Sequence, residues 1–450
     1  MGKDKRPDGV STYPADANDL DSYRQASDAL SRMPAPELVS ADNPHERLFV
    51  AAFDGTGNSM YKDAPENHTN VADIYKQVQR QQLPNIQAGY VEGPGTQGGI
   101  AGAWDMINGN TYEARLEEMY LQFVEQANRW LQKDPQADIR IAGIGFSRGA
   151  EQAAGFARLV EERGIQNPEG MVVKRDSNGL VESIEFTKPP LLEPGRVPQA
   201  VGLFDPVGTG EPRDHDRRLP PSVISGFQIT AEDERRNLFQ GTRILDPGMS
   251  ADGRFLSVTV GGAHSDVGGS YALNGLAIRS GNLMVDYLNA LSDTPFLDKR
   301  AEPAAPELNV VHRSEEHQFF YRTSVYDREG VRGAQEELAP DTLCRIDCLD
   351  AEPRDEAMAA GFEFRKVGIA PIPGAPAAQE QTAAQAPEAA ADTPAARLDR
   401  LLDGRIDPAL QERWDREVAT QRANLDAAQE REQEQAGQQQ QQQAAAEQAR

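Results

Sequence analysis

The chain has 450 residues, which is enough for one large catalytic domain with appendages or for two domains. Only 38% of the residues are hydrophobic, and the formal net charge is −25. This charge excludes a phosphate-neutralising nucleic-acid surface for the chain as a whole, so no nucleic-acid partner is expected. An anionic bilayer would also repel the protein unless a local apolar or basic patch made the contact.

The chain divides into four segments by composition. Residues 1–46 are polar and rich in Asp, Ser and Pro, which predicts an N-terminal arm or a partner surface. Residues 47–295 alternate short apolar runs with longer helical patterns, as expected for βα units around a largely parallel sheet. Residues 296–370 are mixed and acidic, and we interpret them as a lid or small subdomain. Residues 371–450 are rich in Ala, Pro, Gln and Glu, a composition that predicts a low-complexity, partly disordered tail.

Four apolar runs in the second segment have the length and composition of β-strands. They are residues 48–53, 139–146, 200–204 and 255–260. Between the first two runs, residues 111–132 carry apolar side chains at helical spacing, which predicts a helix with one face in the core.

Residues Gly145 to Gly149 form a G-x-S-x-G motif. It comes at the end of the strand-like run 139–146 and directly before a helical pattern. This context is that of a nucleophile elbow, a tight strand-to-helix turn that lifts a serine above the edge of the sheet. We therefore predict an α/β fold of the α/β-hydrolase type, a mostly parallel sheet flanked by helices, with Ser147 as nucleophile. The backbone N–H of Arg148 is the predicted oxyanion donor.

A serine nucleophile needs a base to take its proton and an acid to orient that base. Of the six histidines, only His264 follows a strand-like run, in a glycine-dense turn. Asp205 ends the run 200–204 and comes between Ser147 and His264 in the chain, which is the order of α/β-hydrolases. An aspartate there would otherwise be interpreted as a turn former. The sequence therefore predicts the triad Ser147, Asp205 and His264.

The first strand-like run ends in a glycine-rich polar loop. Gly55 and Thr56 are candidates for a second oxyanion N–H, and Asp54 would brace the loop by accepting backbone hydrogen bonds. A phosphate cradle is the alternative, but the loop lacks the lysine of a P-loop. Calcium binding by Asp54, Asp205 and Asp266 is disfavoured because their spacing differs from that of a contiguous calcium loop. We expect no metal and no cofactor.

Six motifs in this part of the chain resemble, in the same order, those of the type VI secretion lipase effector family. The α/β-hydrolase domain of that family was long catalogued as a domain of unknown function. The motifs are Phe53–Asn58, Gly93–Thr96, Gly145–Ala150, Phe204–Gly208, Asp233–Arg236 and His264–Gly269. The resemblance implies a serine lipase or phospholipase with its triad on Ser147, Asp205 and His264. The sequence departs from the family at Phe204, where the family often has tryptophan.

The resemblance further implies an antibacterial toxin that hydrolyses acyl esters of membrane glycerophospholipids. Its implied partners are a secretion-system component and an immunity protein in the producing cell. No apolar segment follows the basic N-terminus, so we expect synthesis in the cytoplasm without a Sec signal peptide and action in the periplasm of a target cell. The glutamine-rich tail leaves type IV delivery open beside type VI. A soluble carboxylesterase or thioesterase with the same triad, or a scaffold without chemistry, are the alternative functions.

Overall fold

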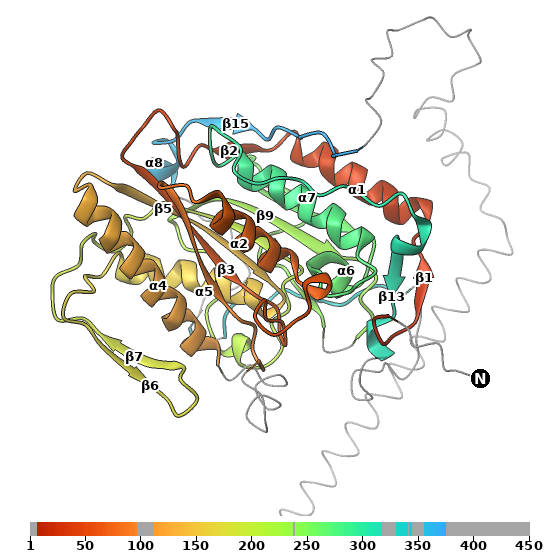
Figure 1. Cartoon of the computed structure of the whole chain (residues 1–450), viewed down its shortest axis with the longest axis horizontal. Coiled ribbons are helices and arrows are strands. Elements are labelled where there is room, and N and C mark those ends of the chain that lie inside the picture. Colours follow the sequence, from red (N-terminus) through yellow and green to blue (C-terminus); the bar gives the residue numbers. More distant parts are fainter. Residues whose placement is uncertain are drawn as a thin grey trace, which may run out of the picture. The chain divides into compact units, whose positions relative to one another are not determined.

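The computed structural model describes residues 7–96, 111–236, 239–316, 330–340, 342–343 and 355–374. Most of the tail predicted over 371–450 lies outside these residues. A seven-stranded sheet forms the centre of the described chain (Figure 1). Its strands are β3 (Glu46–Phe53), β4 (Ile86–Val91), β5 (Asp138–Phe146), β8 (Gln199–Phe204), β9 (Val223–Ala231), β11 (Gly248–Met249) and β12 (Phe255–Val260).

The strand order in this sheet is β11-β12-β9-β8-β5-β3-β4. Neighbouring strands run parallel, apart from the antiparallel pair of β11 and β12. The four apolar runs of the sequence correspond to β3, β5, β8 and β12. Parallel strands are covered on both faces, and for this reason they appear in a sequence as nearly continuous apolar runs.

Helices cover both faces of the sheet (Figure 1). They are α1 (Ala17–Leu30), α2 (Asn70–Gln81), α4 (Tyr112–Lys133), α5 (Arg148–Arg163), α6 (His264–Gly268), α7 (Gly275–Asn289) and α8 (Glu356–Ala359). In β3, Leu48 and Val50 enter a core shared with α1, α2 and α7. Phe49 and Phe53 point the other way, into a core shared with α4 and α5. Helix α4 is the amphipathic helix predicted over residues 111–132.

Shorter elements complete the fold. A hairpin of β6 (Val172–Arg175) and β7 (Val181–Glu185) projects beside α4. Three further pairs join distant parts of the chain: β1 (Thr12–Pro14) with β13 (Val310–His312), β2 (Pro34–Pro36) with β15 (Phe364–Lys366), and β10 (Gly241–Thr242) with β14 (Ala334–Gln335). Single 3₁₀ turns span Pro65–Asn67, Glu211–Asp214, Pro306–Leu308 and Ser314–Glu316.

The N-terminal segment differs from the expected polar arm where the structure describes it. Helix α1 begins at a capping box on Asp16 and packs against β12 and α7. Its buried side chains are Tyr23, Ala26 and Leu30, which recur at helical spacing. These three apolar residues among polar ones leave only a weak sequence pattern, yet they suffice to seat one face of the helix on the sheet. Among the described strands of residues 296–370, β13 and β15 pair with β1 and β2 of the N-terminal segment, and β14 pairs with β10 of the central one. The predicted boundaries at residues 46, 295 and 370 remain predictions.

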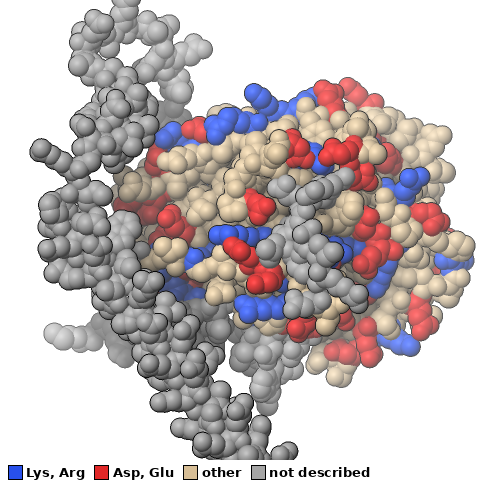
Figure 2. All heavy atoms as spheres, turned by 180° about the vertical axis from the view of Figure 1, so that it is seen from behind, with Lys and Arg blue, Asp and Glu red and all other residues tan. Residues whose placement is uncertain are grey.

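Acidic and basic side chains are intermixed on the face of the molecule shown in Figure 2. Within the described ranges, no helix has both the length and the apolar character to cross a bilayer.

Truncation of Leu30 tests the contribution of α1. Leu30 is fully buried, so Leu30→Ala should lower the free energy of unfolding by about 2–5 kcal/mol, through lost apolar burial and a residual cavity. Urea titration followed by circular dichroism measures this change. The exposed Gln25→Ala on the same helix is the control and should change the free energy by no more than about 0.5 kcal/mol. Equal small effects from both variants would show that α1 is a dispensable arm.

Candidate active site

Ser147 occupies a strained turn between β5 and α5. Its backbone angles are φ 60° and ψ −128°, a conformation that costs a residue with a side chain about 1–3 kcal/mol. The neighbouring glycines permit a close approach of the helix to the sheet. A Cβ on Gly145 would lie 2.2 Å from the Gly149 carbonyl oxygen, and a Cβ on Gly149 would lie 2.3 Å from that of Phe53. This is the geometry of a nucleophile elbow, and together with the parallel sheet it gives the chain an α/β-hydrolase-like fold.

Asp205 and His264 form a buried hydrogen-bonded pair. The Nδ1 of His264 lies 2.5 Å from Oδ2 of Asp205, and both side chains are almost inaccessible to solvent. The other oxygen, Oδ1, accepts hydrogen bonds from the Ala231 backbone N–H at 2.9 Å and from Arg332 Nη1 at 2.5 Å. Burial by itself would raise the pKa of Asp205, but the Arg332 guanidinium and His264 outweigh it and lower the pKa to about 2. Asp205 is therefore ionised throughout the physiological pH range.

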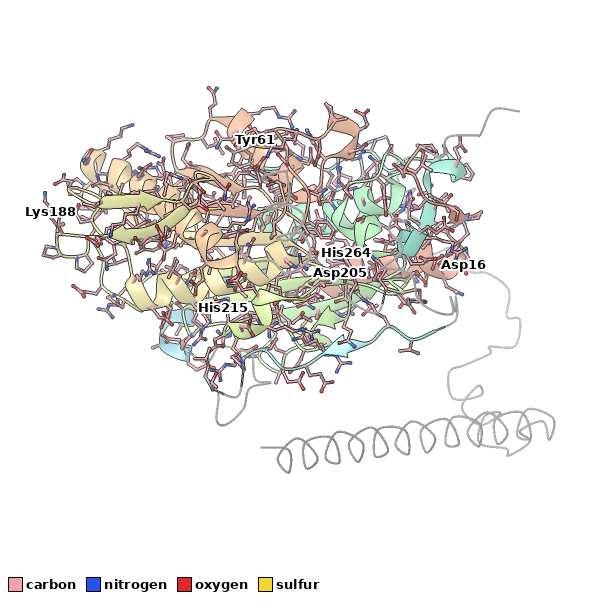
Figure 3. The ribbon with its side chains drawn as sticks, turned by 90° about the horizontal axis from the view of Figure 1, so that it is seen from below. Asp16, Tyr61, Lys188, Asp205, His215 and His264 are labelled. Atoms are coloured by element: carbon pink, nitrogen blue, oxygen red, sulfur yellow. The ribbon has the colours of Figure 1, made fainter. Side chains whose placement is uncertain are left out.

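The sheet register brings Ser147 to the same edge as this pair. Phe146 and Phe204 are register partners in β5 and β8, and the Ser147 N–H donates to the Phe204 carbonyl at 3.0 Å. The Phe146 ring lies 4.6 Å from the His264 ring between centroids. Figure 3 shows Asp205 and His264 side by side in the body of the molecule, well away from Tyr61 and Lys188 at its periphery. The structure thus gathers the three residues singled out in the sequence.

His264 is the first residue of α6, directly after the glycine turn that follows β12. Burial lowers the pKa of His264 below its ordinary value of 6.5; Asp205 and Glu234 oppose this shift, and Arg236 reinforces it. The imidazole is therefore neutral at physiological pH. With Nδ1–H donating to Asp205, Nε2 is the nitrogen left to accept a proton. A neutral histidine in this tautomer is suited to act as a general base.

Asp54 fixes the loop that follows β3. Its carboxylate accepts hydrogen bonds from Tyr90 Oη at 2.5 Å, Thr69 Oγ1 at 2.7 Å and the Gly55 N–H at 2.8 Å. Burial raises the pKa of Asp54 to about 6, although these three donors act to lower it. The Asp54 carboxylate thus joins the Gly55 backbone to Thr69 and Tyr90, and its role as a brace of the loop stays a prediction. Because the Gly55 N–H is directed at Asp54, Thr56 is the stronger of the two oxyanion candidates in this loop.

Arg148 connects the two loops on either side of the serine. Its Nε donates to the Thr209 carbonyl at 2.8 Å, and its Nη1 lies 3.5 Å from Thr56 Oγ1. The backbone N–H of Arg148 belongs to the first turn of α5, where N–H groups point out along the helix axis and favour negative charge. This placement suits the oxyanion role predicted for it.

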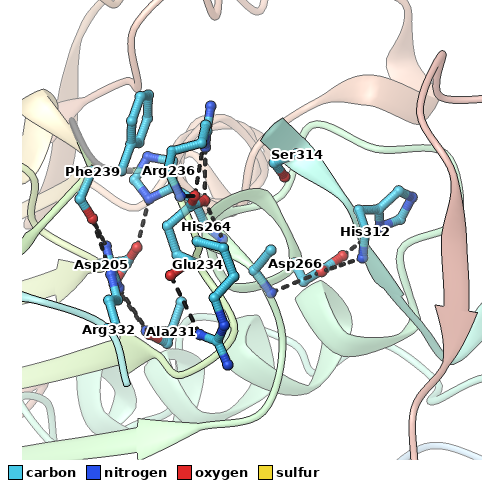
Figure 4. A network of polar contacts seen from close by, with 12 residues as sticks. Asp205, Ala231, Glu234, Arg236, Phe239, His264, Asp266, His312, Ser314 and Arg332 are labelled. Atoms are coloured by element: carbon cyan, nitrogen blue, oxygen red, sulfur yellow. Dashed lines mark hydrogen bonds and ion pairs between the residues drawn. The ribbon is translucent and has the colours of Figure 1, made fainter. Parts of the chain in front are cut away.

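Several polar residues around His264 were given no role in the sequence analysis (Figure 4). Glu234 accepts two hydrogen bonds from the Arg236 guanidinium, both at 2.9 Å. Arg236 lies over the Phe239 ring at 3.4 Å, and the Phe239 ring meets the His264 ring edge-on at 5.1 Å. Glu234 and Arg236 belong to the Asp233–Arg236 motif, whose sequence signal is its place in the family resemblance. No local pattern pointed to Arg332, which lies 127 positions from Asp205 in the chain.

A second buried histidine lies behind α6. His312 Nδ1 is 2.6 Å from Asp266 Oδ1, and His312 Nε2 is 3.0 Å from Asp8 Oδ2. All three side chains have an exposed fraction of 1% or less. Burial would lower the pKa of His312, but the two carboxylates outweigh it and raise the pKa above 6.5. His312 therefore links the beginning of the described chain to the helix that carries His264.

A cavity of about 510 Å³ adjoins Arg332. Arg332 and Ala231 line it together with polar side chains of β9 and β12, whereas Ser147, Asp205 and His264 are not among its described lining residues. The cavity therefore adjoins the Asp205 side chain through Arg332 and Ala231. Among the described residues, no group of three or more His, Cys, Asp and Glu side chains is arranged to hold a metal ion.

Residues 47–178 match the family model described as the T6SS phospholipase effector Tle1-like catalytic domain. The family resemblance is confirmed over this segment. It contains β3, the Asp54 loop and Ser147, and it ends before Asp205 and His264. No curated protein matches the sequence.

Similar solved structures have low sequence identity to this chain. They include an uncharacterized protein from Pseudomonas aeruginosa (16% identity, TM-score 0.37, 90% of this chain and 66% of that one). The Tle1 effector bound to the VgrG spike of the type 6 secretion system has 19% identity and a TM-score of 0.31, over 53% of this chain and 52% of that one. Esterase 2 of Thermogutta terrifontis, phosphonylated by cyclosarin, has 16% identity and a TM-score of 0.27, over 56% of this chain and 86% of that one. This chain thus spans about two thirds of the first protein and about half of Tle1.

Substitution of His312 tests the buried cluster behind α6. His312→Gln leaves Asp8 and Asp266 without their shared cation, so the free energy of unfolding at pH 6 should fall by about 3–5 kcal/mol. Because the folded-state pKa of His312 is raised, its contribution is fully present below the unfolded pKa of 6.5 and is lost as pH rises through the folded pKa. Urea titrations from pH 5.5 to 9 should therefore show the two proteins converging at high pH.

The matched control for this substitution is His45→Gln. His45 contacts Asp134 at 3.0 Å, but the His45 side chain is 43% exposed. Exposed ion pairs contribute at most about 1 kcal/mol, so this variant should remain close to the wild type. A pH-independent loss in His312→Gln would contradict the charged state assigned to His312.

Proposed function

We propose that the chain is a serine-dependent lipase or phospholipase that hydrolyses acyl esters of membrane glycerophospholipids. The hydrogen bond between His264 Nδ1 and Asp205 Oδ2, beside the strained elbow at Ser147, carries the proposal. A neutral, oriented imidazole beside a serine on such a turn is the arrangement that acyl transfer requires. The match of residues 47–178 to the Tle1-like phospholipase effector model supports the class of substrate.

In the proposed acylation step, Ser147 Oγ attacks the ester carbonyl carbon while His264 Nε2 takes the hydroxyl proton. Asp205 keeps the imidazole in the required tautomer and stabilises the imidazolium that forms. The carbonyl oxygen becomes negatively charged and receives hydrogen bonds from the backbone N–H groups of Arg148 and Thr56. Collapse of the tetrahedral intermediate breaks the ester bond, and His264 returns the proton to the leaving lysophospholipid hydroxyl.

In the deacylation step, a water molecule takes the place of the leaving alcohol. His264 removes a proton from the water, whose oxygen attacks the acyl-serine carbonyl through a second tetrahedral intermediate. Return of the proton to Ser147 Oγ releases a free fatty acid and regenerates the enzyme. The mechanism needs no metal ion or organic cofactor.

The biological role that we propose is that of an antibacterial effector. Tle1 has been solved in a complex with the VgrG spike, which supports a secretion-system component as a partner of this chain. The substrate would lie in the membrane of a target cell and be reached from the periplasm. A producing cell would need an immunity protein to block the site. This antibacterial role requires the esterase activity, so the esterase activity is tested first.

Removal of the proposed nucleophile is the direct test. Ser147→Ala should retain the fold while fatty-acid release from phosphatidylethanolamine and phosphatidylglycerol vesicles falls by about 10⁶-fold or to the detection limit, because no hydroxyl remains to be acylated. Release of fatty acid is followed by mass spectrometry, which also identifies the bond that is cut. The half-buried Ser27→Ala on α1 is the control and should match the wild type.

Three results would go against this proposal. Fatty-acid release by Ser147→Ala at the wild-type rate would exclude the serine mechanism. Hydrolysis of short soluble esters by the wild type, with vesicles left intact, would retain the triad but favour a carboxylesterase or thioesterase without a membrane role. Failure of a fluorophosphonate probe to label Ser147 in the folded wild type would favour a scaffold.

A further inference from the structure

Arg332 is held beside the proposed acid by a full set of hydrogen bonds. Its Nη1 donates to Asp205 Oδ1 at 2.5 Å and to the Ala231 carbonyl at 2.8 Å. Its Nε and Nη2 donate to the Phe239 carbonyl at 3.0 and 2.8 Å. The side chain is 8% exposed. A guanidinium bound at both ends to backbone carbonyls has little freedom to move, so it presents a fixed positive charge to Asp205.

We propose that Arg332 is a positioning residue of the catalytic centre, which holds the Asp205 carboxylate in line with His264 and limits the negative charge that Asp205 presents to the imidazole. This inference rests on the proposed function, because it assigns a role within the Ser147, His264 and Asp205 triad. Arg332 does not touch the reacting atoms and acts through Asp205.

The orienting effect follows from how the two carboxylate oxygens are used. Oδ2 faces His264 Nδ1, and Oδ1 faces both Arg332 and the Ala231 N–H. Rotation of the carboxylate would break all three hydrogen bonds together. Without Arg332, the Ala231 N–H alone would hold Oδ1, and the carboxylate could turn away from the imidazole. Arg332 thus fixes the direction in which His264 is held.

The electrostatic effect follows from the charges that face His264. Described carboxylates on the segments next to it each have a cation: Asp205 has Arg332, Glu234 has Arg236, and Asp266 has His312 (Figure 4). Asp233, which accepts a hydrogen bond from the Gly262 N–H, has Arg235. Paired carboxylates stabilise an imidazolium less than unpaired ones do. The pKa of His264 accordingly remains lowered by burial in spite of its acidic neighbours. Arg332 is the nearest cation to the carboxylate that contacts the imidazole.

The segment that supplies Arg332 is anchored in the core. Just after Arg332, β14 pairs with β10. Further along, Leu338 is fully buried, and the Glu337 and Leu338 carbonyls accept hydrogen bonds from Arg217. The position of Arg332 therefore depends on a packed segment and not on a free loop end.

The first test is the pH profile of kcat/KM on a short p-nitrophenyl ester, which avoids any dependence on vesicle binding. The acid limb, where kcat/KM falls as the pH is lowered, reports the macroscopic pKa of the Asp205 and His264 pair. Removing a nearby positive charge raises that pKa, so Arg332→Gln should move the limb to higher pH by roughly one unit. The wild-type limb should lie below pH 6.5. Arg243→Gln, whose arginine pairs with the exposed Glu336 near the same segment, should keep the wild-type profile.

Two further variants separate charge from packing. Arg332→Lys keeps the charge, so its acid limb should stay near that of the wild type, while kcat falls because an ammonium group cannot reach Asp205 and the Phe239 carbonyl together. Arg332→Ala should be partly rescued by added guanidinium, which can replace the missing group as a donor to Asp205. The adjoining cavity gives the solute access to the vacated position. Sodium at equal ionic strength should give no rescue, and Arg243→Ala should not respond.

The inference is overturned if Arg332→Gln keeps the wild-type profile, if the wild-type limb lies above pH 6.5, or if guanidinium fails to rescue folded Arg332→Ala. If Arg332→Gln does not fold, the pH profile of Arg332→Lys is the test. An acid limb at the wild-type position supports the inference, and a shift of that limb to higher pH overturns it. Ser147→Ala is assayed alongside. If Ser147→Ala is as active as the wild type, the proposed function is wrong. If Ser147→Ala is inactive and only the Arg332 predictions fail, the proposed triad is retained and the role proposed for Arg332 is wrong.

Discussion

The parallel register of the central sheet is the constraint on which the site depends. Phe53 lies opposite Gly145, Phe146 opposite Phe204, and Phe204 opposite Ile229, so neighbouring strands end at one edge. The loops that leave this edge carry Asp54, Ser147 and Asp205, and the turn after β12 carries His264. Polar residues that are distant in the chain are therefore collected without any long-range sequence signal, as ligand sites are in open α/β sheets generally. A shift of one residue in the register of any of these strands would move each of its side chains to the opposite face of the sheet and would separate the residues of the site.

Buried charge imposes a second requirement, which explains why the outer segments belong to the catalytic body. A carboxylate taken out of water needs a cation or several hydrogen bonds, because its removal from solvent otherwise costs on the order of several kcal/mol. Asp205 obtains its cation from Arg332, late in the chain. Asp266 obtains its cation from His312, which in turn needs Asp8 from the first residues described. The segments that the sequence suggested as an arm and a lid thus supply charges that the central sheet cannot provide for itself.

The sequence predicted those features that local chemistry determines. The strands β3, β5 and β8 are largely apolar on both faces, and β12 has one apolar face. Helix α4 has a wide apolar stripe, and the elbow has glycines at fixed spacing, so each of these features can be found within a short window. The packing of α1 was not foreseen, because three buried residues among polar ones form a weak stripe. Arg332 and His312 were not foreseen either, because an ion pair between segments far apart leaves no periodicity in either of them. The chemical roles of Ser147, Asp205 and His264 remain predictions.

The cluster of Asp8, Asp266 and His312 has a consequence for the order in which the molecule can be made. Asp8 and His312 are 304 positions apart, so the contact between them forms only after most of the chain has left the ribosome. Contacts of such long range slow folding, since the entropy of closing the loop is lost before the contact is gained. Helix α6, which carries the proposed base, is thus secured at a late stage of synthesis. A nascent chain that stops short of His312 would therefore carry Ser147 without this anchor for the helix that bears His264.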